Sequence, residues 1–306
     1  MSVAAFEDEV LISAHDISKQ YDGFRLDGVS LEVHEGEVVG FIGQNGAGKS
    51  TTIKAILGLI ALDGGKATLL GCDSSTLSKN NAQVKEEVGV VFDTVSVPGH
   101  LKVSDVGRVC SRAYSNWSAQ KFAEFTKLFD LDGSKAVKEL SRGMGMKLSL
   151  ACALSHQTRV LILDEATAGL DPMARDEILD LLLEYVAQDD HGVLLSSHIT
   201  SDLERIADRV VCIDKGRIRF DMEKDAITDE MGIAHCRLAD FERVLAAQNE
   251  GEQVRYLRRD YGIDLCVPHR YDFLRRYPEI PCDRMTIDEY MTFILKGGVR
   301  QCGVPT

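Results

Sequence analysis

The sequence has no long hydrophobic run and no cysteine pattern typical of secreted or metal-binding proteins. No stretch approaches the roughly 20 apolar residues that a membrane helix needs. The first ten residues, MSVAAFEDEV, are acidic and lack the apolar segment of a secretory signal. The eight cysteines are scattered, without a CxxC pair or the Cys/His spacing of metal ligands. We therefore expect reduced thiols in a cytoplasmic protein, whose membrane role, if it has one, requires a separate membrane partner.

Basic residues are fewer than acidic ones. The chain has 35 Lys and Arg against 48 Asp and Glu, a net charge of -13, so a nucleic-acid backbone is not the expected partner. Otherwise the composition is that of a globular protein, with 44% hydrophobic and 27% charged residues. A length of 306 residues provides for one large α/β domain and a smaller appendage.

Strand-like and helix-like segments alternate along most of the chain, which predicts a parallel sheet. The apolar run RVLILDE has the pattern of a central parallel strand that ends in two carboxylates. A helical stretch at about 95–155 interrupts the alternation as an insertion, and the β-rich N-terminal part predicts an antiparallel subdomain. Near residue 222 the sequence becomes more charged. We predict one domain over residues 8–221 and a small α+β extension over 222–306.

Residues 43–50, GQNGAGKS, match the phosphate-binding loop G-x-x-x-x-G-K-[ST] and lie between a predicted strand and a predicted helix. The glycines allow backbone N–H groups to surround phosphates, and the helix adds its positive end. Lys49 is expected to reach the phosphates and the Ser50 hydroxyl to bind Mg²⁺. A glycine-rich turn without a ligand is the alternative. The predicted nucleotide-binding residues of this segment are Gly43, Asn45, Gly46, Ala47, Gly48, Lys49, Ser50 and Thr51.

Two carboxylates end the strand in LILDEATAGLDP. Asp164 is suited to hold Mg²⁺, and Glu165 to act as the base or positioner for an attacking water, a role worth about 10²–10⁴ in rate. A helix-capping turn is the alternative reading of this pair. Together with the phosphate loop the pair predicts a P-loop NTPase with a central, mostly parallel sheet. A guanine-reading NKxD motif is missing, which argues against a GTPase.

The phosphate loop is followed in order by LSRGM, LILDE, GLDP and SSH. In this order and spacing, residues 10–220 resemble the ATPase subunit of an ABC transporter. The resemblance implies ATP hydrolysis with ATP and Mg²⁺, dimerisation with an identical or a related ATPase, and a separate integral-membrane permease.

The resemblance also implies roles for residues outside the phosphate loop. Tyr21 corresponds to the aromatic that stacks on adenine, and His198 to the histidine that contacts the γ-phosphate. The alternatives are an edge or core tyrosine and a structural histidine. From LSRGM, Ser141 and Gly143 would contact the nucleotide of the opposite subunit. Asp171, in the GLDP loop, would also face that subunit.

The pattern departs from the family at two places. Asp93 follows the strand VGVVF where many relatives have a glutamine, so it is expected to act on Mg²⁺ and the attacking water; capping of its loop is the alternative. Arg142 and Met144 replace a glycine and a glutamine of the common LSGGQ. Arg142 is either a phosphate contact or an arginine at the surface or interface without a catalytic role.

This variant signature resembles ATPases of exporters for antibiotics, lantibiotics and polysaccharides. The expectation is therefore an export ATPase, cytoplasmic and peripheral on the inner face of the cell membrane. An importer subunit and a nucleotide-binding regulator with weak hydrolysis remain alternatives. A translation or DNA-repair protein of the same superfamily is disfavoured, because the chain lacks tandem cassettes and inserted coiled coils. The sequence does not identify the cargo.

Overall fold

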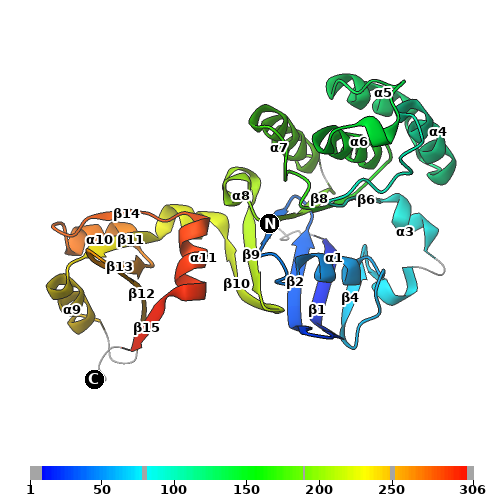
Figure 1. Ribbon diagram of the computed structural model, residues 1–306. Helices are drawn as coiled ribbons and strands as arrows, with labels where there is room; N and C mark the ends of the chain where they lie inside the picture. The colour runs from blue at the N-terminus through cyan, green and yellow to red at the C-terminus, as the bar shows by residue number, and fades with distance from the viewer. Residues whose placement is uncertain (1–8, 78–80, 189, 249–251, 302–306) are drawn as a thin grey trace, which may run out of the picture. The chain divides into compact units, whose positions relative to one another are not determined.

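The computed structural model describes residues 9–77, 81–188, 190–248 and 252–301. The chain divides between Asp221 and Met222 into two compact units, which we describe separately. Figure 1 shows the elements of each unit, coloured along the chain.

A six-stranded sheet forms the centre of the first unit. Its strands lie in the order β10-β9-β3-β8-β7-β6, and β9, β3, β8, β7 and β6 run parallel. Strands β3, β7 and β8 are entirely buried, which explains their continuous apolar sequences. The bounds are β3 Val38–Ile42, β6 Val88–Val91, β7 Val160–Asp164, β8 Gly192–Ser197, β9 Arg209–Asp214 and β10 Arg217–Glu223.

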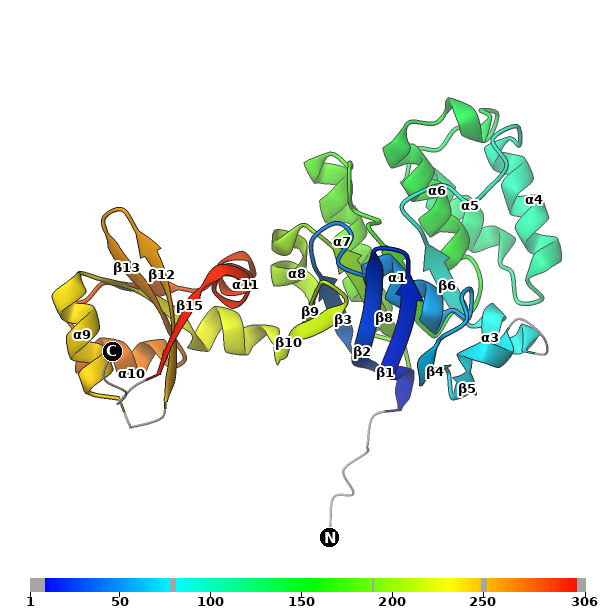
Figure 2. The same ribbon diagram turned by 60° about the horizontal axis from the view of Figure 1, so that its bottom comes forward.

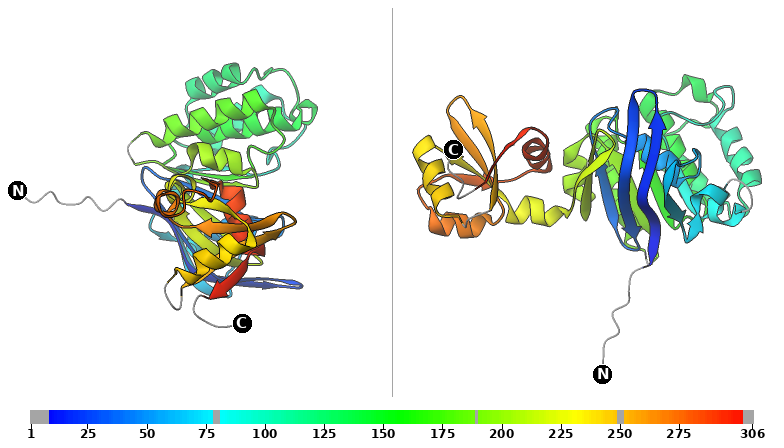
Figure 3. Two further views of the ribbon diagram at one scale, coloured as in Figure 1. Left: turned by 90° about the vertical axis from the view of Figure 1, so that its left-hand side faces the viewer. Right: turned by 90° about the horizontal axis from the view of Figure 1, so that it is seen from below.

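An antiparallel sheet in the order β2-β1-β4-β5 packs beside it, seen in blue in the right-hand view of Figure 3. Its bounds are β1 Val10–Tyr21, β2 Phe24–His34, β4 Gly64–Leu69 and β5 Cys72–Asp73. Helix α1, Lys49–Ile56, shares one hydrophobic core with both sheets. On the other face of the parallel sheet, α8 packs closely on β3. A Cβ added at Gly40 of β3 would lie only 3.0 Å from the Leu203 side chain of α8.

Helices fill the chain between β6 and β7. Helices α4, α5 and α6 lie together in Figures 1 and 2, and α6 packs against β6. Helix α7 follows the GLDP loop and packs on β8 and α8. The bounds are α3 Ala82–Glu86, α4 Val103–Ala113, α5 Ala119–Leu128, α6 Arg142–Leu154, α7 Pro172–Val186 and α8 Thr200–Ile206, with 3-10 turns at Ser74–Thr76 and Val137–Glu139.

The second unit is an antiparallel sheet in the order β14-β11-β13-β12-β15, with helices on both faces (Figure 2). Helices α9 and α10 cover one face with Phe241, Val244 and Phe273, while α11 covers the other. The bounds are β11 Gly232–Cys236, α9 Leu238–Ala246, β12 Gln253–Arg259, β13 Gly262–Val267, α10 Arg270–Arg276, β14 Cys282–Arg284, α11 Ile287–Lys296 and β15 Gly298–Gln301, after a π-helix at Ala226–Glu230.

The predicted fold class is confirmed: a mostly parallel central sheet, an antiparallel subdomain, a helical insertion and an α+β C-terminal part. The predicted strand 88–92 ends one residue earlier, at Val91. In the described ranges, every helix is too short or too polar to cross a bilayer.

Candidate nucleotide-binding site

The phosphate loop joins β3 to α1, and its glycines are required by geometry. Gly46 and Gly48 have φ values of 79° and 122°, in the region that favours glycine. A Cβ at Gly43 would lie 2.4 Å from the Ile213 carbonyl oxygen of β9. Asn45, Gly46 and Ser50 are exposed, whereas the Gly43, Ala47 and Gly48 backbone is buried. The loop therefore presents its tip and the start of α1 to solvent.

The hairpin turn between β9 and β10 supports this loop through backbone hydrogen bonds. The Gly216 N–H donates to the Ala47 carbonyl over 2.8 Å, and the Gly216 carbonyl accepts from the Asp27 N–H. Phe24 and Leu26 of β2 pack on Gly48. The sequence analysis missed that the turn at Lys215-Gly216 supports the phosphate loop. The only local signal was the Lys-Gly turn pair itself.

Lys49 is buried and points back across the loop. Its Nζ donates to the Gly43 carbonyl over 2.6 Å and lies 3.1 Å from Glu165 Oε1. Its side chain is 6% exposed, so its charge has little contact with water and depends on these two partners. An anion with more negative charge than one carboxylate would compete well for this ammonium group.

Asp164 and Glu165 follow β7 but point to different surroundings. Asp164 is 3% exposed, and its Oδ1 has no hydrogen-bond partner among the described residues. Glu165 has a φ of 56°, uncommon for a residue with a side chain, and its N–H donates to the Ser196 carbonyl of β8 over 3.0 Å. Glu165 thus reaches Lys49 and His198, whereas Asp164 Oδ1 stays buried and has no partner within the described residues.

His198 follows β8, and its Nδ1 hydrogen-bonds Glu165 Oε2. Lys49, Glu165 and His198, which come from three different loops, therefore form one continuous chain of contacts. The loops meet because β3, β8 and β7 are neighbours in a parallel sheet and all end at the same edge.

Asp93 and Tyr21 lie at the edges of this cluster. Asp93 follows β6 at the carboxyl edge, is exposed, and makes no hydrogen bond or ion pair within the described ranges. Tyr21 ends β1 with 40% of its surface exposed, and the Lys19 Nζ lies 5.9 Å from its ring centroid. It pairs across the strand with Phe24, which packs on Gly48. An exposed aromatic ring thus stands near the phosphate loop.

The signature segment begins α6 and lies against the GLDP loop of the same chain. Ser141 is the N-cap of α6, and its hydroxyl accepts a hydrogen bond from the Met144 N–H over 3.2 Å. The Arg142 side chain extends over Gly169, 3.5 Å from where a Cβ would stand, and Gly143 faces Leu170. In the part of the chain that the structure describes, no hydrogen bond or ion pair joins Ser141 to the phosphate loop or to Glu165. Within the described residues, the contacts of Ser141 and those of the phosphate loop thus form two separate sets.

Asp171 caps α7. Its carboxylate accepts from the Ala174 N–H over 3.0 Å, and this hydrogen bond holds the pKa of Asp171 below its usual range. Arg142, Gly169 and Asp171 therefore form one exposed surface between the starts of α6 and α7.

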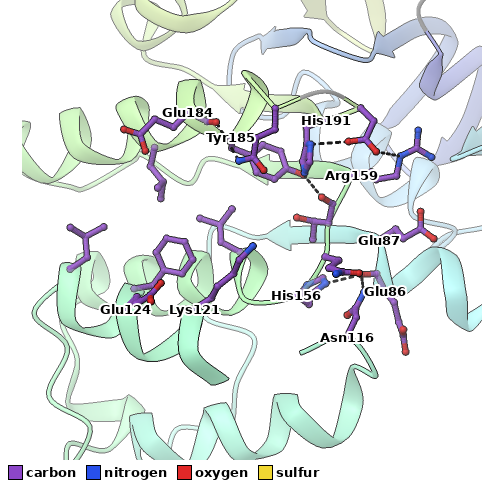
Figure 4. Close-up of a pocket in the computed structure, with 18 of the residues that line it drawn as sticks. Glu86, Glu87, Asn116, Lys121, Glu124, His156, Arg159, Glu184, Tyr185 and His191 are labelled. Atoms are coloured by element: carbon purple, nitrogen blue, oxygen red, sulfur yellow. Dashed lines mark hydrogen bonds and ion pairs between the residues drawn. The ribbon is translucent and has the colours of Figure 1, made fainter. Parts of the chain in front are cut away.

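A large cavity of about 1070 Å³ lies elsewhere, between α3, α5 and the end of α7 (Figure 4). Its walls include Glu86, Arg159 and His191, which precede β6, β7 and β8. The phosphate loop, Glu165 and His198 follow their strands and lie at the opposite edge of the parallel sheet. The cavity is therefore separate from the nucleotide site.

Comparison with known proteins agrees with this class of site. Residues 26–168 match the ABC transporter family. An uncharacterized ABC transporter ATP-binding protein, YhcH of Bacillus subtilis (strain 168), is 34% identical over 67% of this chain and 67% of its own length. The daunorubicin resistance ATP-binding protein DrrA2 of Streptomyces coeruleorubidus is 32% identical over 74% of this chain and 70% of its own. A solved ATP-binding subunit of an ABC transporter superposes with a TM-score of 0.64 at 30% identity, covering 71% of this chain and 91% of that structure.

The fold and the site define a P-loop ATPase. The chain belongs to the ABC transporter family, as an ATP-binding, ATP-hydrolysing subunit.

Proposed function

We propose that this chain powers export through a separate integral-membrane permease, as one half of a dimer that holds ATP between the phosphate loop of one subunit and Ser141 of the other. The observation that carries the proposal is the separation, within one chain, of the Ser141 segment from the Lys49–Glu165–His198 cluster. Each chain has one copy of each motif. Two chains in opposed orientation complete two sites. An identical chain and a related ATPase both satisfy this requirement.

The residues of the cluster have distinct tasks in hydrolysis. The phosphates of ATP compete with Glu165 for the Lys49 ammonium, which releases one carboxylate oxygen of Glu165. Glu165 then accepts a proton from the water that attacks the γ-phosphorus, while His198 orients this carboxylate through its present hydrogen bond. Ser141 of the opposite subunit donates its hydroxyl to a γ-phosphate oxygen, adjacent to the positive end of α6.

The residues present fit Mg²⁺. Asp164 Oδ1 is a buried carboxylate oxygen without a partner among the described residues, and the Ser50 hydroxyl is exposed at the start of α1. In the described ranges no group of three His, Cys, Asp or Glu residues forms a metal cage on its own. Mg²⁺ typically binds through one or two protein oxygens together with phosphates, so Asp164 and Ser50 would hold it with ATP. The ion would neutralise charge that develops on the phosphates.

Asp93 supports a second candidate, a nucleotide-binding regulator with weak hydrolysis. As an exposed carboxylate at the carboxyl edge, Asp93 would repel phosphates if brought close and cannot donate a hydrogen bond when ionised. Asp93→Gln tests this. An increase in the ATPase rate without a change in ATP affinity would support the regulator, whereas a decrease would support Asp93 as part of a working ATPase.

Mixed dimers test the shared site. Lys49→Ala disables the phosphate loop and Ser141→Arg the signature, so each variant alone should be inactive. A dimer with one copy of each has one intact composite site, and mixing the two proteins should restore ATP hydrolysis. No recovery in mixtures of folded variants, with dimers verified by light scattering, would overturn the ATP sandwich.

Export, the permease and a peripheral position on the inner face of the cell membrane rest on the variant signature and on the relative named for daunorubicin resistance. Co-purification from detergent-solubilised membranes should recover a multi-helix integral-membrane protein in a fixed ratio with this chain. In proteoliposomes of the two, ATP should drive a drug-like cargo away from the ATPase side. Movement toward that side would indicate an importer.

A further inference from the structure

Helices α7 and α8 each begin at a loop of the nucleotide site, and they pack on each other. Asp171 of the GLDP loop is the N-cap of α7, and α8 begins at Thr200, two residues after His198. Asp171 is exposed, whereas His198 reaches Glu165. The contact between the two helices therefore lies between the loop proposed to face the opposite subunit and the proposed base of the same chain.

Two ion-pair contacts of opposite polarity join these helices. On the exposed side, Arg205 of α8 hydrogen-bonds Asp176 of α7 and, over 2.7 Å, Asp180 one turn further along. On the buried side, Arg175 of α7 places its Nε 3.9 Å from Asp202 Oδ1 of α8. Each helix thus supplies an arginine to a carboxylate of the other.

The two contacts differ in their exposure to water. The side chains of Arg205, Asp176 and Asp180 are between 36% and 62% exposed, so salt screens these pairs and they contribute little to stability. The Asp202 side chain is only 3% exposed, and its Oδ2 has no hydrogen-bond partner within the described residues. Arg175 compensates this buried carboxylate, so the position of each depends on the charge of the other.

Backbone hydrogen bonds connect the buried pair to both loops. The Arg175 N–H donates to the Asp171 carbonyl over 3.0 Å, in the first turn of α7. The Asp202 N–H donates to the Ile199 carbonyl over 3.3 Å, directly after His198. The Arg175–Asp202 pair therefore joins the turn that carries His198 to the GLDP loop.

We propose that Asp202 and Arg175 are positioning residues for ATP hydrolysis, which hold the His198 turn in a fixed place relative to the GLDP loop. In the described ranges neither side chain has a hydrogen bond or ion pair with His198 or Glu165, so both act through the two loops. When the opposite subunit binds at Asp171, a shift of α7 moves α8 with it and sets the place of His198 and of the carboxylate that His198 hydrogen-bonds. This coupling rests on the proposed ATP sandwich.

Asp202→Asn tests the pair, because it keeps the shape of the side chain and removes its charge. The kcat for ATP hydrolysis should fall by about 2- to 30-fold, the range that couplings through such contacts span. The KM for ATP should stay at the wild-type value, because the phosphate loop keeps its contacts. Arg175→Lys retains the positive charge and should retain most of the rate. Arg205→Gln, which breaks ion pairs between the same helices on their exposed side, is the matched control and should have the wild-type kcat.

A double-mutant cycle shows whether Asp202 acts through His198. Asp202→Asn added to His198→Ala should lower kcat no further than His198→Ala alone, because the ring that Asp202 positions is already gone. The nucleotide-free protein provides a second measurement. The nitrogen NMR signal of His198 Nδ1, assigned by its loss in His198→Ala, should shift in Asp202→Asn and stay in place in Arg205→Gln.

Thermal unfolding shows whether each variant has folded. If Asp202→Asn does not fold, Arg175→Gln tests the same pair from its more exposed partner and should show the same fall in kcat. A wild-type kcat in the folded variant, or an equal loss in Arg205→Gln, would overturn the proposal. Effects of Asp202→Asn and His198→Ala that simply multiply, or an unchanged His198 signal, would overturn it as well.

Failure of the proposed function would give a different pattern. No recovery of hydrolysis in mixtures of Lys49→Ala and Ser141→Arg would count against the ATP sandwich. The His198 signal would still report on the Arg175–Asp202 pair, because its shift depends neither on dimerisation nor on turnover.

Discussion

Replacing Glu165 with glutamine separates the two tasks of this side chain, proton acceptance and competition for Lys49. Glutamine keeps the shape but cannot accept a proton from water, so kcat should fall by about 10²–10⁴. The ion pair with Lys49, 3.1 Å long with side chains 6% and 16% exposed, is also lost.

The magnitude of the second effect follows from this burial. A hydrogen bond to a charged group contributes about 1.5–3 kcal/mol, and about 1.4 kcal/mol corresponds to tenfold in affinity. Since the glutamine amide oxygen still accepts a weaker hydrogen bond from Lys49, the gain in ATP affinity should be no more than about tenfold. Glu165→Gln should therefore bind ATP at least as tightly as the wild type.

The assay combines single-turnover hydrolysis, equilibrium ATP binding and light scattering with MgATP. The variant should accumulate as an ATP-bound dimer. Glu124→Gln removes a carboxylate on the exposed face of α5, where it accepts a hydrogen bond from Gln120, and serves as the control with wild-type behaviour. If Glu165→Gln hydrolysed ATP at the wild-type rate, or bound it much more weakly, the assignment of base and competitor to Glu165 would be wrong.

Three further predictions concern the loop, the signature and the C-terminal unit. Gly43→Ala places a Cβ 2.4 Å from the Ile213 carbonyl, so it should lower the unfolding free energy by about 1–3 kcal/mol and weaken ATP binding. Gly64→Ala, whose Cβ would have its nearest neighbour at 3.8 Å, should change neither quantity. Calorimetry and nucleotide titration measure the two effects. Arg142→Gly removes the side chain over Gly169 and should lower the melting temperature slightly, while ATPase activity remains because Ser141 still caps α6. A loss of ATPase activity as complete as that of Ser141→Ala would instead make Arg142 a phosphate contact. Burial lowers the pKa of His235, but its hydrogen bonds to Asp264 and Asp283 outweigh burial and raise the pKa overall. The stability that protonated His235 contributes is therefore present below the unfolded pKa of about 6.5 and is lost as the pH rises through the higher folded pKa. The melting temperature of the C-terminal unit should accordingly fall from mildly acidic to mildly alkaline pH. A His235→Gln variant with the same pH dependence would show that His235 is not its cause.

Local sequence determined much of this protein. The strand, glycine loop and helix of residues 38–56 are contiguous, so the phosphate loop was readable from spacing alone. The continuous apolar sequence of β7 predicted a buried parallel strand, and a local capping box of Thr286 and Glu289 begins helix α11.

Tertiary structure decided which of these parts meet. Lys49, Glu165 and His198 contact one another because β8 lies between β3 and β7, and strand order depends on long-range packing that no local pattern encodes. For the same reason, the local sequence does not predict the hydrogen bond from Gly216 to Ala47 or the position of Arg142 over Gly169.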